Sequence, residues 1–275
     1  MYTLNCKGRL LVIEDPIVMG IINMTPDSFY KGSRQPSVDA VLRETEKMLR
    51  DGATIIDIGG QSTRPGSKAV GIDVELERVI PSIKAVSQAF PDAFISIDTY
   101  NADVAKAAAD AGACIVNDVS AGEMDLHMLE TVATLRVPYI AMHMKGTPAT
   151  MQQLARYDNV TRDVLDYFIH KTEQCRLAAI HDVIVDVGFG FAKTIAHNFQ
   201  LLKDLPVFQM LNVPILAGLS RKSTVYKTLG TSAEEALNGT TVLNSIALLN
   251  GAKILRVHDV KEAKEAIMLV GAYGK

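Results

Sequence analysis

A short phrase recurs along this chain: a Gly-Ala pair leads into an apolar run, and the run stops on a polar residue. The phrase reads GATII before Asp57, GACIV before Asn117 and GAKIL before Arg256, and comparable runs stop at Asn23, at Asp98, at Asp186 and shortly before Lys222. A strand that is buried on both faces does not tolerate such side chains in its interior, so each stop marks a strand end. Polar groups from several strand ends then share one rim, as they do at the C-terminal face of a parallel β/α barrel.

The hydrophobic pattern predicts eight strands that alternate with helices. The strands are expected near residues 17–22, 54–58, 93–97, 113–117, 137–142, 182–186, 213–218 and 252–257. The helices are expected near 38–49, 73–89, 101–110, 125–135, 158–179, 196–204, 234–250 and 260–272. Eight such units favour a closed (β/α)8 TIM barrel over the competing flavodoxin-like open sheet. Residues 4–15 precede the first barrel strand and are expected to form a short N-terminal hairpin that closes the bottom of the barrel.

Composition fits one barrel domain over residues 1–275, because 48% hydrophobic residues can bury one large core. The formal net charge of -3 argues against nucleic acid as a partner, since a phosphodiester-binding face needs a dense basic patch. The first apolar stretch is too short for a signal peptide, and no run approaches the length of a membrane span. Cys6, Cys114 and Cys175 are an odd, widely spaced set that suggests neither a disulfide framework nor a thiolate metal site. We therefore expect a cytoplasmic protein with small-molecule partners.

Two of the predicted strand-to-helix loops, residues 23–36 and 59–72, are longer than the usual connection of about 4 to 6 residues. The first contains NMTPDSFYKGS and the second GGQSTRPGS, so both combine glycine, proline and polar side chains. Long loops on this face usually bind a ligand or close over one. Each loop could alternatively be a rigid turn that carries a solvated arginine, but the occurrence of two such loops favours the binding interpretation.

The residues at these strand ends and loops resemble the dihydropteroate synthase family over essentially the whole chain. The motifs that carry the resemblance are NMTPDSF (23–29), GGQSTRPG (59–66), Asp98-Thr99, Asn117-Asp118, Asp186 with GFGF (188–191), SRKS (220–223) and RVHD (256–259). The first two are highly specific, whereas Asp98, Asn117 and Asp186 are shared with the wider group of pterin-binding barrels. The chain departs from the common family pattern at Gln61, Val187 and Ala192, and none of these changes removes a required functional group.

The resemblance implies that 6-hydroxymethyl-7,8-dihydropterin diphosphate and p-aminobenzoate condense to 7,8-dihydropteroate and pyrophosphate. A carboxylate can accept two neighbouring N–H donors of the pterin, while an amide can pair with the remaining ring edge and a lysine can donate to the oxo group. The implied pterin-binding residues are Asp98, Asn117, Met142, Asp186, Phe191, Gly218 and Lys222. Met142, Phe191 and Gly218 have ordinary core packing as their alternative interpretation.

The resemblance also implies a catalytic group that consists of Asp98, Lys222, Arg256 and Arg64. Departure of pyrophosphate leaves positive charge on the pterin methylene, and Asp98 would stabilise that charge electrostatically. The implied pyrophosphate contacts are Asn23, Arg64, Arg256 and His258, with Mg²⁺ as the cofactor and Asn23 as its protein ligand. His258 on its own would more often be a structural histidine.

The second substrate, p-aminobenzoate, is expected at Phe29, Thr63, Pro65 and Ser223. The arylamine attacks an activated carbon directly, so no protein nucleophile is expected. Asp57 is expected to organise the second loop through backbone N–H groups.

Two alternative functions are compatible with a pterin-binding barrel, and the sequence also predicts an oligomeric state. A corrinoid-linked methyltransferase barrel would share the pterin residues but has no use for a cationic pyrophosphate site, and a silent paralogue would be expected to lose cationic or loop residues. The apolar segment 242–249 and the resemblance together predict a homodimer.

Overall fold

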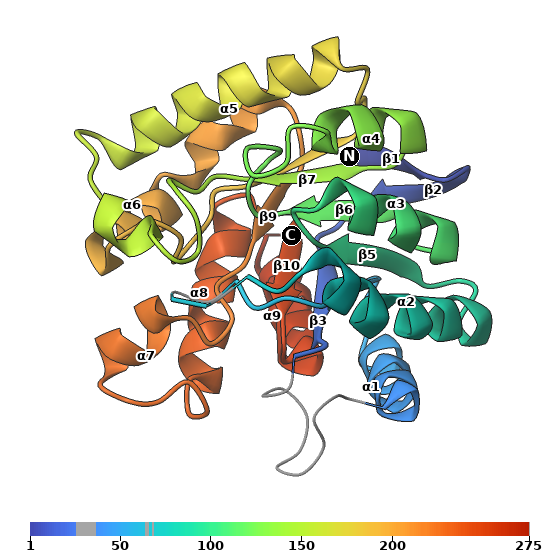
Figure 1. Cartoon of the computed structure of the whole chain (residues 1–275). Helices are drawn as coiled ribbons and strands as arrows, with labels where there is room; N and C mark the ends of the chain where they lie inside the picture. Colours follow the sequence, from blue (N-terminus) through green and yellow to red (C-terminus); the bar gives the residue numbers. More distant parts are fainter. Residues whose placement is uncertain (26–36, 64–65, 68, 275) are drawn as a thin grey trace.

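Eight parallel strands close into a barrel, as the sequence predicts. The structure is a computed structural model that describes residues 1–25, 37–63, 66–67 and 69–274. The strands are β3 (Ile17–Asn23), β4 (Ile55–Gly59), β5 (Phe94–Asp98), β6 (Ile115–Asp118), β7 (Tyr139–Met142), β8 (Val183–Asp186), β9 (Ile215–Ala217) and β10 (Ile254–Val257). They pair in chain order, and β10 closes the barrel against β3 (Figure 1).

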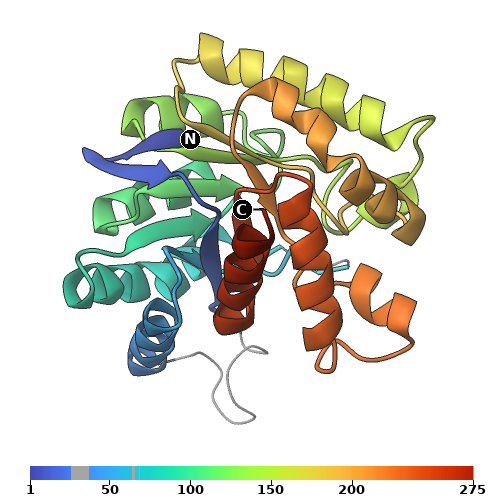
Figure 2. The same cartoon turned by 180° about the vertical axis from the view of Figure 1, so that it is seen from behind.

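Helices separate the strands and form the outer layer of the molecule (Figures 1 and 2). They are α1 (Val38–Arg50), α2 (Ile72–Ala89), α3 (Ala102–Ala111), α4 (Met128–Leu135), α5 (Val160–Leu177), α6 (Ile195–Lys203), α7 (Ser223–Leu229), α8 (Leu237–Leu249) and α9 (Val260–Tyr273), with 3-10 turns η1 (Met151–Leu154) and η2 (Leu205–Leu211). The sequence predicts a single helix between β9 and β10, whereas the structure has α7 and α8. Gly230 ends α7 in a left-handed conformation with φ 68°, which an L side chain rarely adopts.

The glycine of the recurring phrase has a structural reason. Gly52, Gly112 and Gly251 all have positive φ, at 104°, 124° and 97°, and each follows a helix and precedes a strand. Glycine reaches this conformation without the steric cost of a Cβ atom, so it lets the chain leave the outer helix and turn back into the barrel.

A short antiparallel hairpin precedes the barrel and consists of β1 (Tyr2–Cys6) and β2 (Arg9–Ile13). Its inward side chains are Leu4, Cys6, Leu11 and Ile13. These belong to the same buried cluster as the inward residues of the barrel strands, which include Met19, Ile55, Ile115, Ile140, Ile184, Leu216 and Ile254. The hairpin therefore closes the bottom of the barrel with apolar side chains, and the strand ends that carry polar side chains lie on the opposite face.

Candidate active site

Strand register brings the predicted polar residues onto one rim. Asn23 is opposite Gly59, Gly59 is opposite Asp98, and Asp98 is opposite Asn117. On the other side of the barrel Met142 is opposite Asp186. Neighbouring parallel strands thus end at the same level, and their terminal side chains face a common space.

Arg256 is held between two carboxylates at the centre of this rim. Its Nε donates to Asp57 Oδ2 at 2.7 Å, and its Nη2 lies 2.6 Å from both Asp57 Oδ2 and Asp98 Oδ2. The Arg256 side chain is 20% exposed, and the two carboxylates are almost completely buried. Burial opposes the charge on Arg256, but attraction to Asp57 and Asp98 raises its pKa overall. The guanidinium is therefore fixed and charged, and part of it remains exposed to solvent.

The expected role of Asp57 as an organiser of the second loop is wrong. Asp57 Oδ2 accepts from Arg256 and from Asn117 Nδ2 at 3.1 Å, and its Oδ1 has no hydrogen-bond partner in the part of the chain that the structure describes. Asp57 lies on the same face of β4 as Ile55, which belongs to the inner cluster of the barrel, so its side chain points inward to Arg256 and Asn117. It therefore orients two predicted ligand-binding side chains, Arg256 and Asn117.

Asp98 is buried in an unusual electrostatic environment. Burial raises the pKa of its carboxyl from 3.8 to about 7, Arg256 lowers it, and Asp57 raises it. Within the described residues its Oδ1 has no hydrogen-bond partner, although the side chain is 6% exposed. This carboxylate can stabilise a positive charge that develops beside it in a site of low dielectric constant.

Asp186 and Lys222 lie on either side of Gly218. A Cβ atom at Gly218 would lie 3.5 Å from Lys222 Nζ and 3.7 Å from Asp186 Oδ2, so both charged groups lie close to this glycine. Asp186 Oδ1 accepts from the Gly188 N–H at 2.8 Å. Burial lowers the pKa of the Lys222 ammonium to about 8, against the raising effect of Asp186. A flat ligand with hydrogen-bond donors on one edge and an acceptor on the other would satisfy both groups.

The loop after β8 supplies a wall for this space. Lys222 Nζ donates to the Phe189 carbonyl oxygen at 2.5 Å and lies 4.8 Å from the centre of the Phe191 ring. Phe191 packs with Met142 in a small buried cluster. The structure thus places Met142, Phe191 and Gly218 beside Asp186 and Lys222, and their predicted contact with a pterin stays a prediction.

Serine and histidine connect the last two loops of the rim. Ser220 Oγ lies 2.9 Å from His258 Nδ1 and also accepts from the His258 backbone N–H at 3.2 Å. Beside them Arg221 forms a bidentate pair with Asp259, with both N···O distances at 2.8 Å. These contacts hold the loop that carries Lys222 and Ser223 against the end of β10. His258 is therefore oriented by Ser220, whose role the sequence analysis did not predict.

Some predicted residues are located less completely. Phe29, Arg64 and Pro65 lie outside the described residues. Asn23 is half-buried at the end of β3, Thr63 is half-buried in the second loop, and Ser223 is half-buried as the first residue of α7. The structure places these three on the same face as Arg256.

The three departures from the family pattern have local consequences. Gln61 is buried and its Oε1 accepts from the Val70 N–H at 2.8 Å, so it joins the two ends of the second loop. Val187 is completely buried. Ala192 has φ 50°, where glycine would be unstrained, so this departure costs on the order of 1 kcal/mol of backbone strain.

The oxygen atoms that the rim offers could bind Mg²⁺ only together with oxygens from a ligand. The described residues contain no group of three or more His, Cys, Asp or Glu side chains that could hold a metal ion. Mg²⁺ often keeps most of its waters and takes its other oxygens from a phosphate group, which requires few protein ligands. The Asn23 amide oxygen therefore fits a magnesium ion that arrives with a diphosphate, and a protein-only metal site does not fit.

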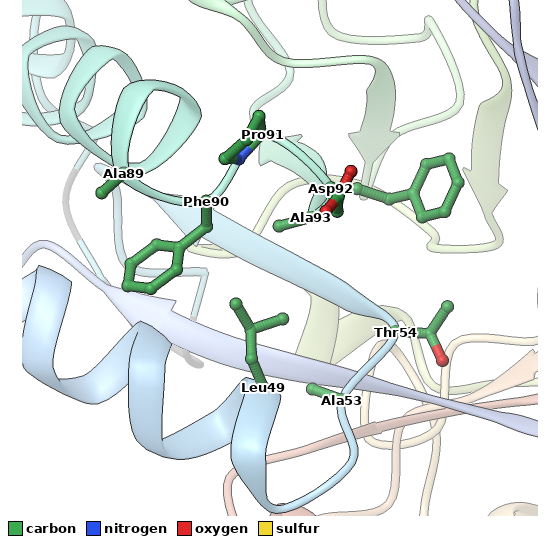
Figure 3. Close-up of a pocket in the computed structure, with 9 residues that line it drawn as sticks. Leu49, Ala53, Thr54, Ala89, Phe90, Pro91, Asp92 and Ala93 are labelled. Atoms are coloured by element: carbon green, nitrogen blue, oxygen red, sulfur yellow. The ribbon is translucent and has the colours of Figure 1, made fainter.

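A hollow at the far end of the barrel carries no comparable chemistry. It is lined by the ends of α1 and α2 and the starts of β4 and β5, including Leu49, Ala53 and Phe90 (Figure 3). Asp92 is the charged residue among those that line it.

No helix in the described part of the chain is long and apolar enough to cross a membrane.

Known proteins share both the sequence and this architecture. Residues 19–258 match the family model for pterin binding enzymes. Dihydropteroate synthase of Escherichia coli K12 is 42% identical over 268 residues, which cover 97% of this chain and 94% of that protein. The crystal structure of Yersinia pestis dihydropteroate synthase with a sulfonamide drug complex superposes with a TM-score of 0.94 and 41% identity, over 99% of both chains. Xanthomonas albilineans dihydropteroate synthase in complex with 7,8-dihydropteroate superposes with a TM-score of 0.89 and 36% identity, also over 99% of both chains.

Proposed function

The chain belongs to the dihydropteroate synthase family of pterin-binding transferases, and on that premise we propose how the residues of its rim divide the reaction. The reaction of folate biosynthesis joins 6-hydroxymethyl-7,8-dihydropterin diphosphate to p-aminobenzoate and releases pyrophosphate. The observation that supports our division best is the arrangement of Arg256 between Asp57 and Asp98, with Lys222 and Asp186 across the rim.

The pterin ring binds between Asp186 and Lys222. Asp186 accepts from the amino group and a ring N–H, Asn117 pairs with the remaining edge, and Lys222 donates to the oxo group. Gly218 leaves room for the flat ring, and Phe191 and Met142 pack against it. Each hydrogen bond to a charged partner contributes about 1.5 to 3 kcal/mol.

Asp98 acts when the bond to the diphosphate breaks. The departing pyrophosphate takes the bonding electrons, and positive charge spreads from the methylene carbon into the dihydropterin ring. Asp98 lies beside Asn117 at the rim, and its carboxylate stabilises that charge without reorganisation. The arylamine of p-aminobenzoate then attacks the methylene carbon and loses a proton.

The leaving group needs positive charge around it. Arg256 and His258 present cationic or donor groups at the end of β10, and Arg64 is proposed to join them from the second loop. When bound, Mg²⁺ would neutralise part of the diphosphate charge, with Asn23 as its protein ligand. Arg256 is held in place by Asp57, so it can contact the diphosphate without a change of rotamer.

The p-aminobenzoate site is proposed to form from Phe29, Thr63, Pro65 and Ser223. Three of these residues belong to the two long loops, so we propose that bound pyrophosphate, through Asn23 and Arg64, helps to complete the site. We expect p-aminobenzoate to bind weakly to the protein alone and more tightly with pterin, Mg²⁺ and pyrophosphate present. Sulfonamides should follow the same order. Isothermal titration with and without the other ligands tests this, and equal affinity in both states would contradict it.

A pyrophosphate-release assay that depends on both substrates tests the reaction itself. Asp186→Ala tests the pterin pocket, because buried ring donors would lose their charged acceptor and retain their desolvation cost. Calorimetry with the pterin diphosphate should show no measurable binding to this variant, and an unchanged dissociation constant would remove Asp186 from the site.

A homodimer through α8 and α9 is supported by their outward side chains. The two helices lie side by side, as Figure 2 shows from behind. In the segment 242–249 Leu243, Ala247 and Leu248 are buried, whereas Val242 and Leu249 are 50% and 57% exposed. On α9 Met268 and Leu269 are also exposed, so both helices carry exposed apolar side chains.

Sedimentation at micromolar protein concentration tests the dimer, and a monomer alone would contradict it.

We also propose a reducing cytoplasm as the compartment, which agrees with three buried cysteines that form no disulfide.

A further inference from the structure

A buried lysine outside the proposed substrate contacts lies behind the pterin pocket. Lys193 is 3% exposed and stands at the end of the loop between β8 and α6. Its Nζ lies 3.0 Å from His143 Nδ1, 3.2 Å from the His143 carbonyl oxygen and 3.0 Å from the Phe191 carbonyl oxygen. Three acceptors match the three N–H donors of an ammonium group, so the side chain can be buried without an unsatisfied donor.

These hydrogen bonds join two separate parts of the rim. His143 directly follows β7, and its backbone N–H donates to the Asp186 carbonyl oxygen at 3.1 Å. Phe191 belongs to the loop that follows β8. Lys193 therefore fastens that loop to the end of the neighbouring strand, at the level of the pterin pocket.

The loop that Lys193 fastens makes each of its polar contacts with the pocket through its backbone. The Gly188 N–H holds Asp186 Oδ1, and the Phe189 carbonyl accepts from Lys222. Gly188 passes so close to His143 that a Cβ atom there would collide with the His143 carbonyl oxygen and lie 3.2 Å from Lys193 Nζ. Backbone groups can orient Asp186 and Lys222 only if the loop itself is fixed.

The surroundings of Lys193 also bear on the charge of the pocket. Burial lowers the pKa of the Lys193 ammonium well below its usual value, while Asp186 raises it. Burial likewise lowers the pKa of His143 to about 2, so the imidazole is neutral and its Nδ1 can accept a hydrogen bond. Lys193 is thus a buried group whose hydrogen-bond partners are His143 and Phe191.

We propose that Lys193 is a positioning residue for pterin binding, which acts by fixing the loop 187–193 so that Gly188 and Phe189 hold Asp186 and Lys222 at the ring edge. This inference rests on the proposed pterin pocket. Because the contacts that Lys193 supports are made in the ground state and in the transition state alike, its loss should raise KM for the pterin substrate and leave kcat nearly unchanged.

Lys193→Met tests the proposal, because methionine keeps much of the length and loses the three donors. We expect KM for the pterin diphosphate to rise by about ten- to a hundredfold, which is the effect of losing one charge-assisted hydrogen bond between the pocket and the pterin. The value of kcat should stay within about threefold. KM for p-aminobenzoate at saturating pterin should stay within the same limit. Hydrogen exchange at residues 187–191 should become faster.

Lys171→Met is the matched control. Lys171 is also a buried lysine, with 7% of its surface exposed, and it lies on α5, outside the rim. Its Nζ lies 3.7 Å from Glu123 Oε1. This variant should lose thermal stability with an unchanged KM for the pterin diphosphate. An equal rise of that KM in both variants would show that stability alone is responsible and would overturn the proposal.

His143→Leu keeps the question testable if Lys193→Met does not fold. It removes one of the three acceptors and should raise the same KM by a smaller factor. Asp186→Ala, measured beside these variants, distinguishes a wrong positioning role for Lys193 from a wrong assignment of the pterin pocket. If Asp186→Ala abolishes pterin binding while neither Lys193→Met nor His143→Leu changes KM, the positioning role is wrong and the pocket stands. If Asp186→Ala has no effect, the pocket assignment itself is wrong.

Discussion

Replacing Asp57 with asparagine should move the pH dependence of catalysis. The proposed role of Asp98 requires its ionised form, and burial places its pKa at about 7. Activity should therefore rise with pH through that value. Asp57 raises the pKa of Asp98, since two negative charges on one rim disfavour each other. Asparagine keeps an oxygen acceptor for Arg256 and removes the charge.

The distances set the size of the effect. Asp57 Oδ2 and Asp98 Oδ2 both lie 2.6 Å from Arg256 Nη2, so they are at most about 5 Å apart. Two unit charges at that separation repel by about 3 kcal/mol at an effective dielectric constant of about 20. This energy corresponds to about two pKa units. In the pH profile of kcat/KM, the midpoint of the acid limb should therefore shift from near pH 7 in the unchanged protein to about pH 5 in the Asp57→Asn variant.

The assay is kcat/KM for pyrophosphate release, measured from about pH 4 to about pH 9 with saturating p-aminobenzoate. Asp182→Asn is the control, because Asp182 accepts from the Asn5 N–H at the bottom of the barrel and should leave the profile unchanged. An acid limb that stays in place in Asp57→Asn, or moves to higher pH, would refute the electrostatic coupling between Asp57 and Asp98.

Three further variants test other parts of the rim. Asp98→Asn should lower kcat by about a hundredfold to a thousandfold while pterin affinity stays within about threefold, and equal changes in both would contradict the charge-stabilising role. Arg256→Lys should lower turnover by about tenfold or more, because an ammonium cannot reproduce the planar contacts to two carboxylates; an unchanged rate would contradict this. Gly188→Ala should lower the thermal midpoint by at least about 4 °C, since its φ of 73° is strained for alanine and the new Cβ meets the His143 carbonyl. Gly230→Ala, at φ 68° in open space, should cost less, and equal losses would contradict the steric argument.

Most of the barrel could be predicted from sequence because its elements have local signals. Strands buried on both faces appear as short apolar runs, and polar residues mark where they end. The predicted strand at 17–22 became β3 (Ile17–Asn23), and the predicted helix at 260–272 became α9 (Val260–Tyr273). The predicted helix at 234–250 became α8 (Leu237–Leu249), whereas α7 (Ser223–Leu229), a short helix that ends at Gly230, was not predicted.

The sequence by itself determined which chemical groups lie at or next to the strand ends. Asp98 and Asp186 are the last residues of β5 and β8, whereas Asp57 and Arg256 lie inside β4 and β10, where they pair with each other. Tertiary structure decided which of those groups meet. Asp57 and Arg256 are 199 residues apart and are brought into contact by closure of the barrel, and Lys193 reaches His143 across 50 residues. No local pattern encodes such pairs, because they depend on strand register and on the burial that makes an unpaired charge costly. The same burial raises the pKa of Asp98 and lowers that of Lys222, so the electrostatics of the site arise only in the folded protein.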